Sequence, residues 1–180
     1  MTDVRVVESG MVFGPFPSED CWEIEHSACY LEISQGVQIA EFVRIEHRRK
    51  RPPLIWTVEA KTGSPNPAVK QDDFDKFIGK ICAKLTNTMM LAVATCLGRH
   101  PDYKYELPTS FKVLDLAKAD FRLVLVIKGD PNPFPDAWLP PIKDALALSL
   151  QPLVNTWRLS PTAVMVFNQA LAKQYGLIMD

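Results

Sequence analysis

The chain has 180 residues, 47% hydrophobic and 23% charged, which suits one globular domain over 1–180 with a substantial core. Its 20 Lys and Arg nearly balance its 21 Asp and Glu, giving a formal net charge of −1. This balance excludes nucleic-acid binding driven by overall charge, so any such binding requires a local basic patch.

The cysteines and histidines indicate no zinc site. The 4 cysteines form no CxxC pair, and the 3 histidines add no zinc-ligand spacing. We predict free, mostly buried thiols in a reducing compartment. The N-terminal stretch MTDVRVVESG has no apolar signal region, and no run approaches the ~20 apolar residues of a membrane span. A cytoplasmic protein with no membrane partner is therefore expected.

The first half of the chain predicts a hairpin preceded by short elements. Residues 1–20 are interpreted as a loose lead-in, 21–25 as a short strand, and 27–33 as a short helix capped by Ser27. Apolar residues alternate over 37–46, which predicts a strand. A basic turn, HRRKRPP at 47–53, separates it from a second strand over 54–61, and the two strands are expected to pair.

The second half predicts alternating helices and strands. The helical repeat of apolar residues over 72–97 is the strongest in the chain; Asp72 or Asp73 would cap this helix and Gly98 would end it. A short helix over 111–116 precedes FRLVLVI at 121–127, a strand expected to be buried on both faces. A loop (129–135), a helix (138–150), strands (153–159 and 163–167) and a closing helix (168–175) follow. This order indicates an α/β domain with a mixed sheet.

A Glu-x-Lys sequence ends the strand over 54–61. Glu59 and Lys61 have the same parity, so they project from one face of the strand, whereas Trp56 projects from the other. If the turn is centred near Lys50, the numbers of opposed residues sum to about 100. Glu41 then faces Glu59, with Cβ atoms roughly 4.5–5.5 Å apart.

Two facing carboxylates repel each other unless a cation lies between them. Carboxylate oxygens suit Mg²⁺ or Mn²⁺, and either ion can activate water and stabilise a phosphoryl group in transfer. We therefore expect Glu41 and Glu59 to bind Mg²⁺ (or Mn²⁺) and Lys61 to assist the attacking water. The alternative is an exposed strand end at which Glu59 and Lys61 form an ordinary surface ion pair.

The pattern resembles the PD-(D/E)xK superfamily, the restriction-endonuclease-like fold, over about residues 21–130. Glu41 in QIAEFV corresponds to the family's first acid, and Glu59 and Lys61 in WTVEAK correspond to its second acid and its lysine. The resemblance implies an αβββαβ core, here followed by a helix-strand-strand-helix extension. One departure is that Glu41 replaces the usual aspartate, with no proline before it.

Further residues are candidates for the same site. Family members often carry an additional acid near the first helix, for which Glu25 is preferred over Glu32. Lys80 and Lys84 lie one turn apart on the predicted long helix, and either could approach the acids. The basic turn at 48–51 is the only dense positive patch; it is either a phosphate grip beside the metal or a solvated hairpin tip.

These features predict a metal-dependent nuclease that hydrolyses phosphodiester bonds, with DNA favoured over RNA. Glu41, Glu59, Lys61 and Glu25 form its expected site, and nucleic acid is its expected partner. A nuclease of this size would need a homodimer or a partner protein to gain specificity. The alternatives are a non-catalytic nucleic-acid-binding or regulatory module on the same fold, and an unrelated α/β protein with Glu59 and Lys61 on its surface.

Overall fold

A mixed sheet forms the middle layer of the computed structural model, which describes residues 2–69, 71–129 and 135–179. Its strand order is β3-β4-β5-β6-β7. β3, β4 and β5 pair antiparallel, whereas β6 and β7 join in parallel. The five strands are β3 (Cys21–Trp22), β4 (Phe42–Glu46), β5 (Leu54–Lys61), β6 (Asp120–Ile127) and β7 (Val164–Asn168). The α/β class and the mixed sheet are as predicted.

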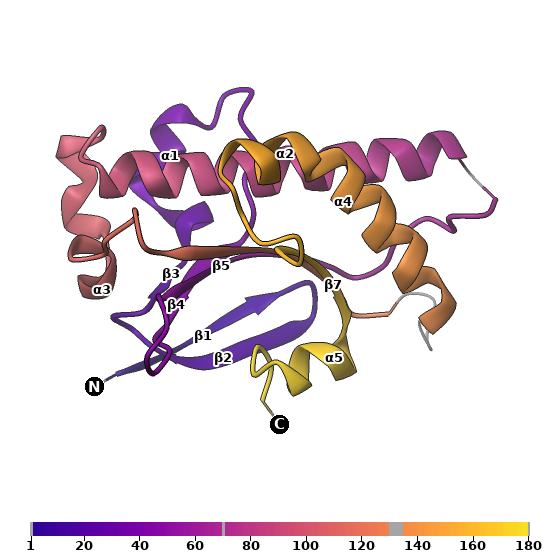
Figure 1. The fold of residues 1–180 in the computed structure, drawn as a ribbon, viewed down its shortest axis with the longest axis horizontal. Helices are drawn as coiled ribbons and strands as arrows, with labels where there is room; N and C mark the ends of the chain where they lie inside the picture. The colour runs from indigo at the N-terminus through magenta and orange to yellow at the C-terminus, as the bar shows by residue number, and fades with distance from the viewer. Residues whose placement is uncertain (1, 70, 130–134, 180) are drawn as a thin grey trace.

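Helices cover one face of this sheet, and a hairpin with a short helix covers the other (Figure 1). α2 (Gln71–Cys96) and α4 (Leu139–Thr156) lie on the first face. The hairpin of β1 (Asp3–Glu8) and β2 (Met11–Pro17) lies on the second with α5 (Gln169–Gln174). Each layer encloses its own apolar cluster, so β5 and β6 are buried on both sides.

The remaining helices of the described residues are short. α1 (Ala28–Ile33) has Ser27 as its N-cap, because the Ser27 side chain accepts a hydrogen bond from the Tyr30 amide. α3 (Thr109–Lys112) is shorter than the predicted 111–116 helix. Three 3₁₀ turns complete the set: Ile24–His26, Pro101–Glu106 and Asp136–Trp138.

The predicted loose lead-in over 1–20 is wrong, because β1 and β2 form an antiparallel hairpin there. Ser9 and Gly10 make its two-residue turn with φ of 50° and 69°. Positive φ at both positions is the backbone of the hairpin turns that match strand twist. The alternating apolar residues flanking a Ser-Gly pair were the signal for this hairpin.

The predicted strand over 37–46 begins only at Phe42. Ahead of it, the Ala40 amide donates to Thr88 Oγ1 of α2 at 2.6 Å, so this amide bonds to the helix and not to a neighbouring strand. The predicted strand over 21–25 likewise ends at Trp22, and residues 24–26 turn into a 3₁₀ helix.

The predicted strand over 153–159 is wrong, because α4 continues through Pro152 to Thr156. Leu153 and Val154 pack against the apolar cluster beneath the helix, and this packing favours continuation despite one lost backbone bond. The segment after β6 is therefore helix-strand-helix, not helix-strand-strand-helix. The predicted loop over 129–135 lies mostly outside the described residues.

α2 follows the prediction closely and lies across the sheet (Figure 1). It ends before Gly98, whose φ is +73°, while Asp72 and Asp73 fall inside its first turn instead of capping it. By length and composition alone this helix could cross a membrane, which is weak evidence, because core helices pass the same test. Its buried side chains, including Ile81 and Leu85, belong to the core between this helix and the sheet.

Candidate metal and phosphodiester site

The β4–β5 hairpin has the register predicted from the sequence. Phe42 pairs with Val58 and Val43 with Thr57, so the numbers of paired residues sum to 100. Just ahead of β4, the Glu41 amide donates to the Val58 carbonyl at 3.1 Å, one residue off the register of the paired strands. The Glu41 and Glu59 carboxylates both project toward α2, where Lys84 Nζ lies within 3.7 Å of each.

Glu59 is fully buried between two ammonium groups. Its Oε1 lies 2.5 Å from Lys61 Nζ and 3.0 Å from Lys84 Nζ, and its Oε2 accepts a hydrogen bond from Lys84 Nζ at 3.1 Å. Neither ammonium meets Oε1 at hydrogen-bonding angles, so charge attraction alone holds that oxygen. Glu59 is 0% exposed, so this carboxylate depends on its cationic neighbours.

Lys84 joins the two acids. Its Nζ lies 3.7 Å from Glu41 Oε1 as well as within 3.1 Å of both Glu59 oxygens. Burial lowers the pKa of Lys84, but the Glu59 carboxylate outweighs that effect and the net pKa is raised. Lys84 is therefore a cation at the place where facing carboxylates need one.

Glu25 completes the group through Glu41. The Glu25 amide donates to the Glu41 carbonyl at 3.5 Å. Burial, the neighbouring Glu25 carboxyl and the Glu59 charge raise the pKa of Glu41 to about 9, so its protonated form is favoured at neutral pH.

The four residues predicted for the site, Glu25, Glu41, Glu59 and Lys61, thus come together. Of the two candidate lysines on α2, Lys84 joins them, whereas Lys80 is exposed. Sequence reasoning missed Thr88, whose Oγ1 donates to the Lys84 carbonyl at 2.7 Å and accepts the Ala40 amide. Thr88 thereby fixes the segment that leads into Glu41. Its position one turn after Lys84 was the available signal.

Glu8 was also missed. Ligand atoms of Glu8, Glu25 and His26 lie within 4.8 Å of one another, at the tip of the β1–β2 hairpin. Glu8 and Glu25 are half-buried and His26 is exposed. Exposed acidic groups gather without an ion in many proteins, so this cluster identifies neither Mg²⁺ nor Mn²⁺.

The basic turn does not lie beside the acids. It connects β4 and β5 at the end opposite Glu59, and a strand of this length spans roughly 20 Å or more. Arg48 there pairs with Asp120 at 2.5 Å. The hairpin places the basic turn and the Glu-x-Lys residues at opposite ends of β5. The turn therefore cannot bind a phosphate that lies beside Glu41 and Glu59.

The site fits a hard divalent cation in its chemistry. The donor atoms are carboxylate oxygens, which Mg²⁺ and Mn²⁺ prefer, but buried Glu59 Oε1 already has the Lys61 and Lys84 ammonium groups at 2.5 and 3.0 Å. Two changes would accompany an ion: Glu41 would release its proton, and Lys84 would move away from the carboxylates.

Replacing Glu41 with glutamine is expected to stabilise the metal-free protein above neutral pH. The pKa of Glu41 is raised from 4.5 to about 9, so the folded chain holds a proton that the unfolded chain releases in between. The contribution of protonated Glu41 to the free energy of unfolding is therefore fully present below pH 4.5 and is lost as the pH rises toward 9. Glutamine keeps a donor for Glu25 but has no proton to lose. Urea unfolding at pH 5 and pH 8.5 should give Glu41→Gln an advantage on the order of 1–3 kcal/mol at the higher pH only. Parallel pH profiles for the two proteins would contradict the raised pKa of Glu41.

No protein-family model, curated protein or solved structure matches this chain.

Proposed function

We propose that the protein is a metal-dependent nuclease of the PD-(D/E)xK type, with DNA as the favoured substrate. The observation that carries the proposal is the convergence of Glu41, Glu59 and Lys61 at one end of β5. A divalent ion bound by Glu41 and Glu59 would supply an activated water and charge stabilisation at the phosphoryl group. Cytoplasmic location is part of the same proposal.

The order of elements supports this proposal. β3, β4, β5, α2 and β6 follow one another as βββαβ, with Glu41 just before the second strand and Glu59 and Lys61 on the third. The resemblance implies a helix ahead of the first strand, whereas α1 follows β3. The short turn and helix over 24–33 instead bring Glu25 to Glu41.

Each residue has a distinct task in the proposed reaction. Glu59 holds Lys61 by charge at 2.5 Å, and the Lys61 side chain is 33% exposed, so its ammonium can reach a phosphate from the surface. Lys61 would orient the attacking water and stabilise the developing negative charge. Glu25 lies beside Glu41 and would support the position of that acid.

A cleavage assay tests the proposal directly. Supercoiled plasmid, single-stranded DNA and RNA would be incubated with the protein in Mg²⁺, in Mn²⁺ and in EDTA. We expect cleavage of DNA that requires the ion and is lost in Lys61→Ala. Equal cleavage by parent and Lys61→Ala would indicate a contaminating nuclease, and no cleavage of any substrate would refute the catalytic proposal.

A second candidate is a non-catalytic binding or regulatory module on the same fold. Lys84 favours it, because an ammonium already lies within 3.7 Å of both acids and neutralises them without an ion. The raised pKa of Glu41, which favours its neutral form, acts in the same direction. In that case the acids and Lys84 would be a structural ion-pair group.

Replacing Lys84 with glutamine separates the two candidates. In a metal site, Lys84 competes with the ion, so Lys84→Gln should lower the metal-free melting temperature but tighten Mn²⁺ binding by roughly tenfold, about 1.4 kcal/mol. Calorimetric titration with Mn²⁺ measures this affinity. Lys80→Gln, an exposed change on the same helix, is the control. Unchanged or weaker Mn²⁺ binding in Lys84→Gln would favour the structural group.

A further inference from the structure

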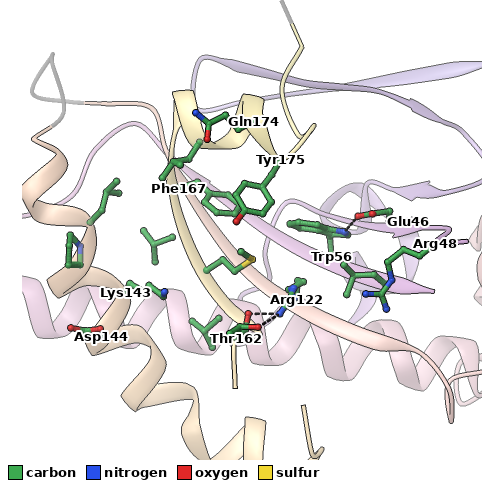
Figure 2. A pocket seen from close by; sticks show the side chains of 17 residues that line it. Glu46, Arg48, Trp56, Arg122, Lys143, Asp144, Thr162, Phe167, Gln174 and Tyr175 are labelled. Atoms are coloured by element: carbon green, nitrogen blue, oxygen red, sulfur yellow. Dashed lines mark hydrogen bonds between the residues drawn. The ribbon is translucent and has the colours of Figure 1, made fainter. Parts of the chain in front are cut away.

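A hollow of about 960 Å³ lies beside the edge of β7, between α4 and α5 (Figure 2). Small-molecule sites in proteins are concave and have volumes of roughly 300–1,000 Å³. Trp56 and Phe167 line this hollow from the hairpin face of the sheet, whereas Glu59 projects from the α2 face. The hollow is therefore separate from the candidate metal site and has room for a small molecule.

The floor of the hollow is packed, and the side chains around it are accessible. Val164, Val166 and Phe167 line it but are only 5%, 6% and 3% exposed, so they give it an apolar floor. Met165 is half-buried, and Tyr175 is 47% exposed. A ligand can contact these accessible side chains without disturbing the core of the chain.

Arg122 is the side chain that indicates the charge of such a ligand. It is half-buried, and its Nη1 donates to the carbonyl oxygen and to Oγ1 of Thr162 (Figure 2). Both acceptors are neutral, and among the described residues no carboxylate forms an ion pair with Arg122. The N–H groups on Nε and Nη2 remain for a ligand, and a guanidinium binds an oxyanion through two parallel N–H groups.

The other charges that line the hollow cancel. They are two cations and two acids: Arg48, Lys143, Glu46 and Asp144. Ion-pair partners outside the hollow balance as well, because Asp120 pairs with Arg48 and Arg44 with Glu46. The uncompensated Arg122 therefore leaves the hollow with a net positive charge, which favours an anion.

The aromatic rings indicate a planar ligand. Tyr175 stacks on Phe167 with centroids 4.6 Å apart, and its ring lies edge-on to Trp56 with centroids 6.4 Å apart. Trp56 and Arg122 are register partners in β5 and β6, so the rings and the guanidinium are neighbours on one face of the sheet. A planar ring packed against Tyr175 can therefore carry an anionic group to Arg122.

We propose that this hollow binds a small aromatic anion, a planar ring system that carries one carboxylate, sulfonate or phosphate group. The ring system packs against Tyr175 and Met165, and the anionic group accepts the N–H groups of Arg122 that Thr162 leaves free. This site does not depend on the proposed nuclease activity, because the two sites lie on opposite faces of the sheet.

Titration with two matched fluorescent probes tests the proposal. Anilinonaphthalenesulfonate carries a sulfonate, whereas N-phenylnaphthylamine has the same rings and no charge. The folded parent should bind the sulfonate at one saturable site and more tightly than the neutral probe. Arg122→Met should weaken the sulfonate about tenfold, through the loss of charge-assisted hydrogen bonds, and leave the neutral probe unchanged. Arg99→Met, a change of an exposed arginine outside the hollow, should affect neither probe.

A second variant and two competitors complete the test. Tyr175→Ala should weaken both probes, and circular dichroism should be unchanged in every variant. Displacement of the sulfonate by adenosine monophosphate would identify a nucleotide-like ligand, and displacement by naphthoate an aromatic carboxylate. The proposal is overturned if the parent binds no sulfonate saturably, if Arg122→Met weakens both probes equally or neither, or if neither competitor displaces the sulfonate.

Discussion

Replacing Glu59 with alanine is expected to lower the free energy of unfolding by about 2–4 kcal/mol and the melting temperature by about 5–15 °C. The substitution removes a fully buried carboxylate and leaves Lys61 and Lys84 without their shared partner. The loss lies below that of a completely buried pair, because the two lysine side chains are 33% and 16% exposed. Thermal and urea unfolding in EDTA measure it.

A double-mutant cycle identifies the cause of this loss. Lys84→Met added to Glu59→Ala removes the stranded ammonium, so the double variant should be more stable than Glu59→Ala alone. Asp102→Ala, a change of an exposed acid, should shift the free energy of unfolding by no more than about 0.5 kcal/mol. Additive losses in the cycle would mean that Glu59 and Lys84 do not interact.

Replacing Lys61 with alanine is expected to reduce cleavage on the order of 100- to 1000-fold while the fold and ion binding persist. Lys61 is at the end of β5 and is partly exposed, so its loss uncovers little apolar surface. Ion binding should survive or tighten, because one competing cation is gone. The measurements are initial cleavage rates and the Mn²⁺-induced melting shift in the same variant.

Lys80→Ala is the matched control for this prediction, because Lys80 is an exposed lysine on α2 away from the acids. It should cleave like the parent. Loss of both cleavage and the ion-induced shift in Lys61→Ala would make Lys61 a structural support for the acids. Cleavage at the parent rate would indicate a contaminating nuclease and would leave no support for Lys61 in the proposed reaction.

The β4–β5 hairpin could be predicted because its information is local. Alternating apolar residues set the faces, and the turn near Lys50 set the strand register that brings Glu41 and Glu59 to the same end of the hairpin. α2 was predictable for the same reason, since its apolar repeat is long and Gly98 ends it. These two elements carry most of the candidate site.

Features that depend on tertiary packing were not predictable to the same degree. Which of Lys80 and Lys84 joins the acids depends on how α2 is rotated against the sheet, and Thr88 and Ala40 help to fix that rotation. The continuation of α4 past Pro152 depends on core packing that local propensity does not express. The position of Glu8 beside Glu25 follows from where the first hairpin docks.

Titration with Mn²⁺ in the parent, Glu41→Gln and Glu59→Gln tests most directly the claim that the two acids bind an ion. At a free ion concentration about 100 times the dissociation constant, the parent should gain about 2.7 kcal/mol, a melting shift of roughly 5–10 °C. Both variants should lose this shift, whereas His26→Ala should keep it, because His26 is exposed and lies with Glu8 and Glu25, not with Glu41 and Glu59. An equal shift in Glu59→Gln, or no saturable binding in the parent, would contradict the metal site.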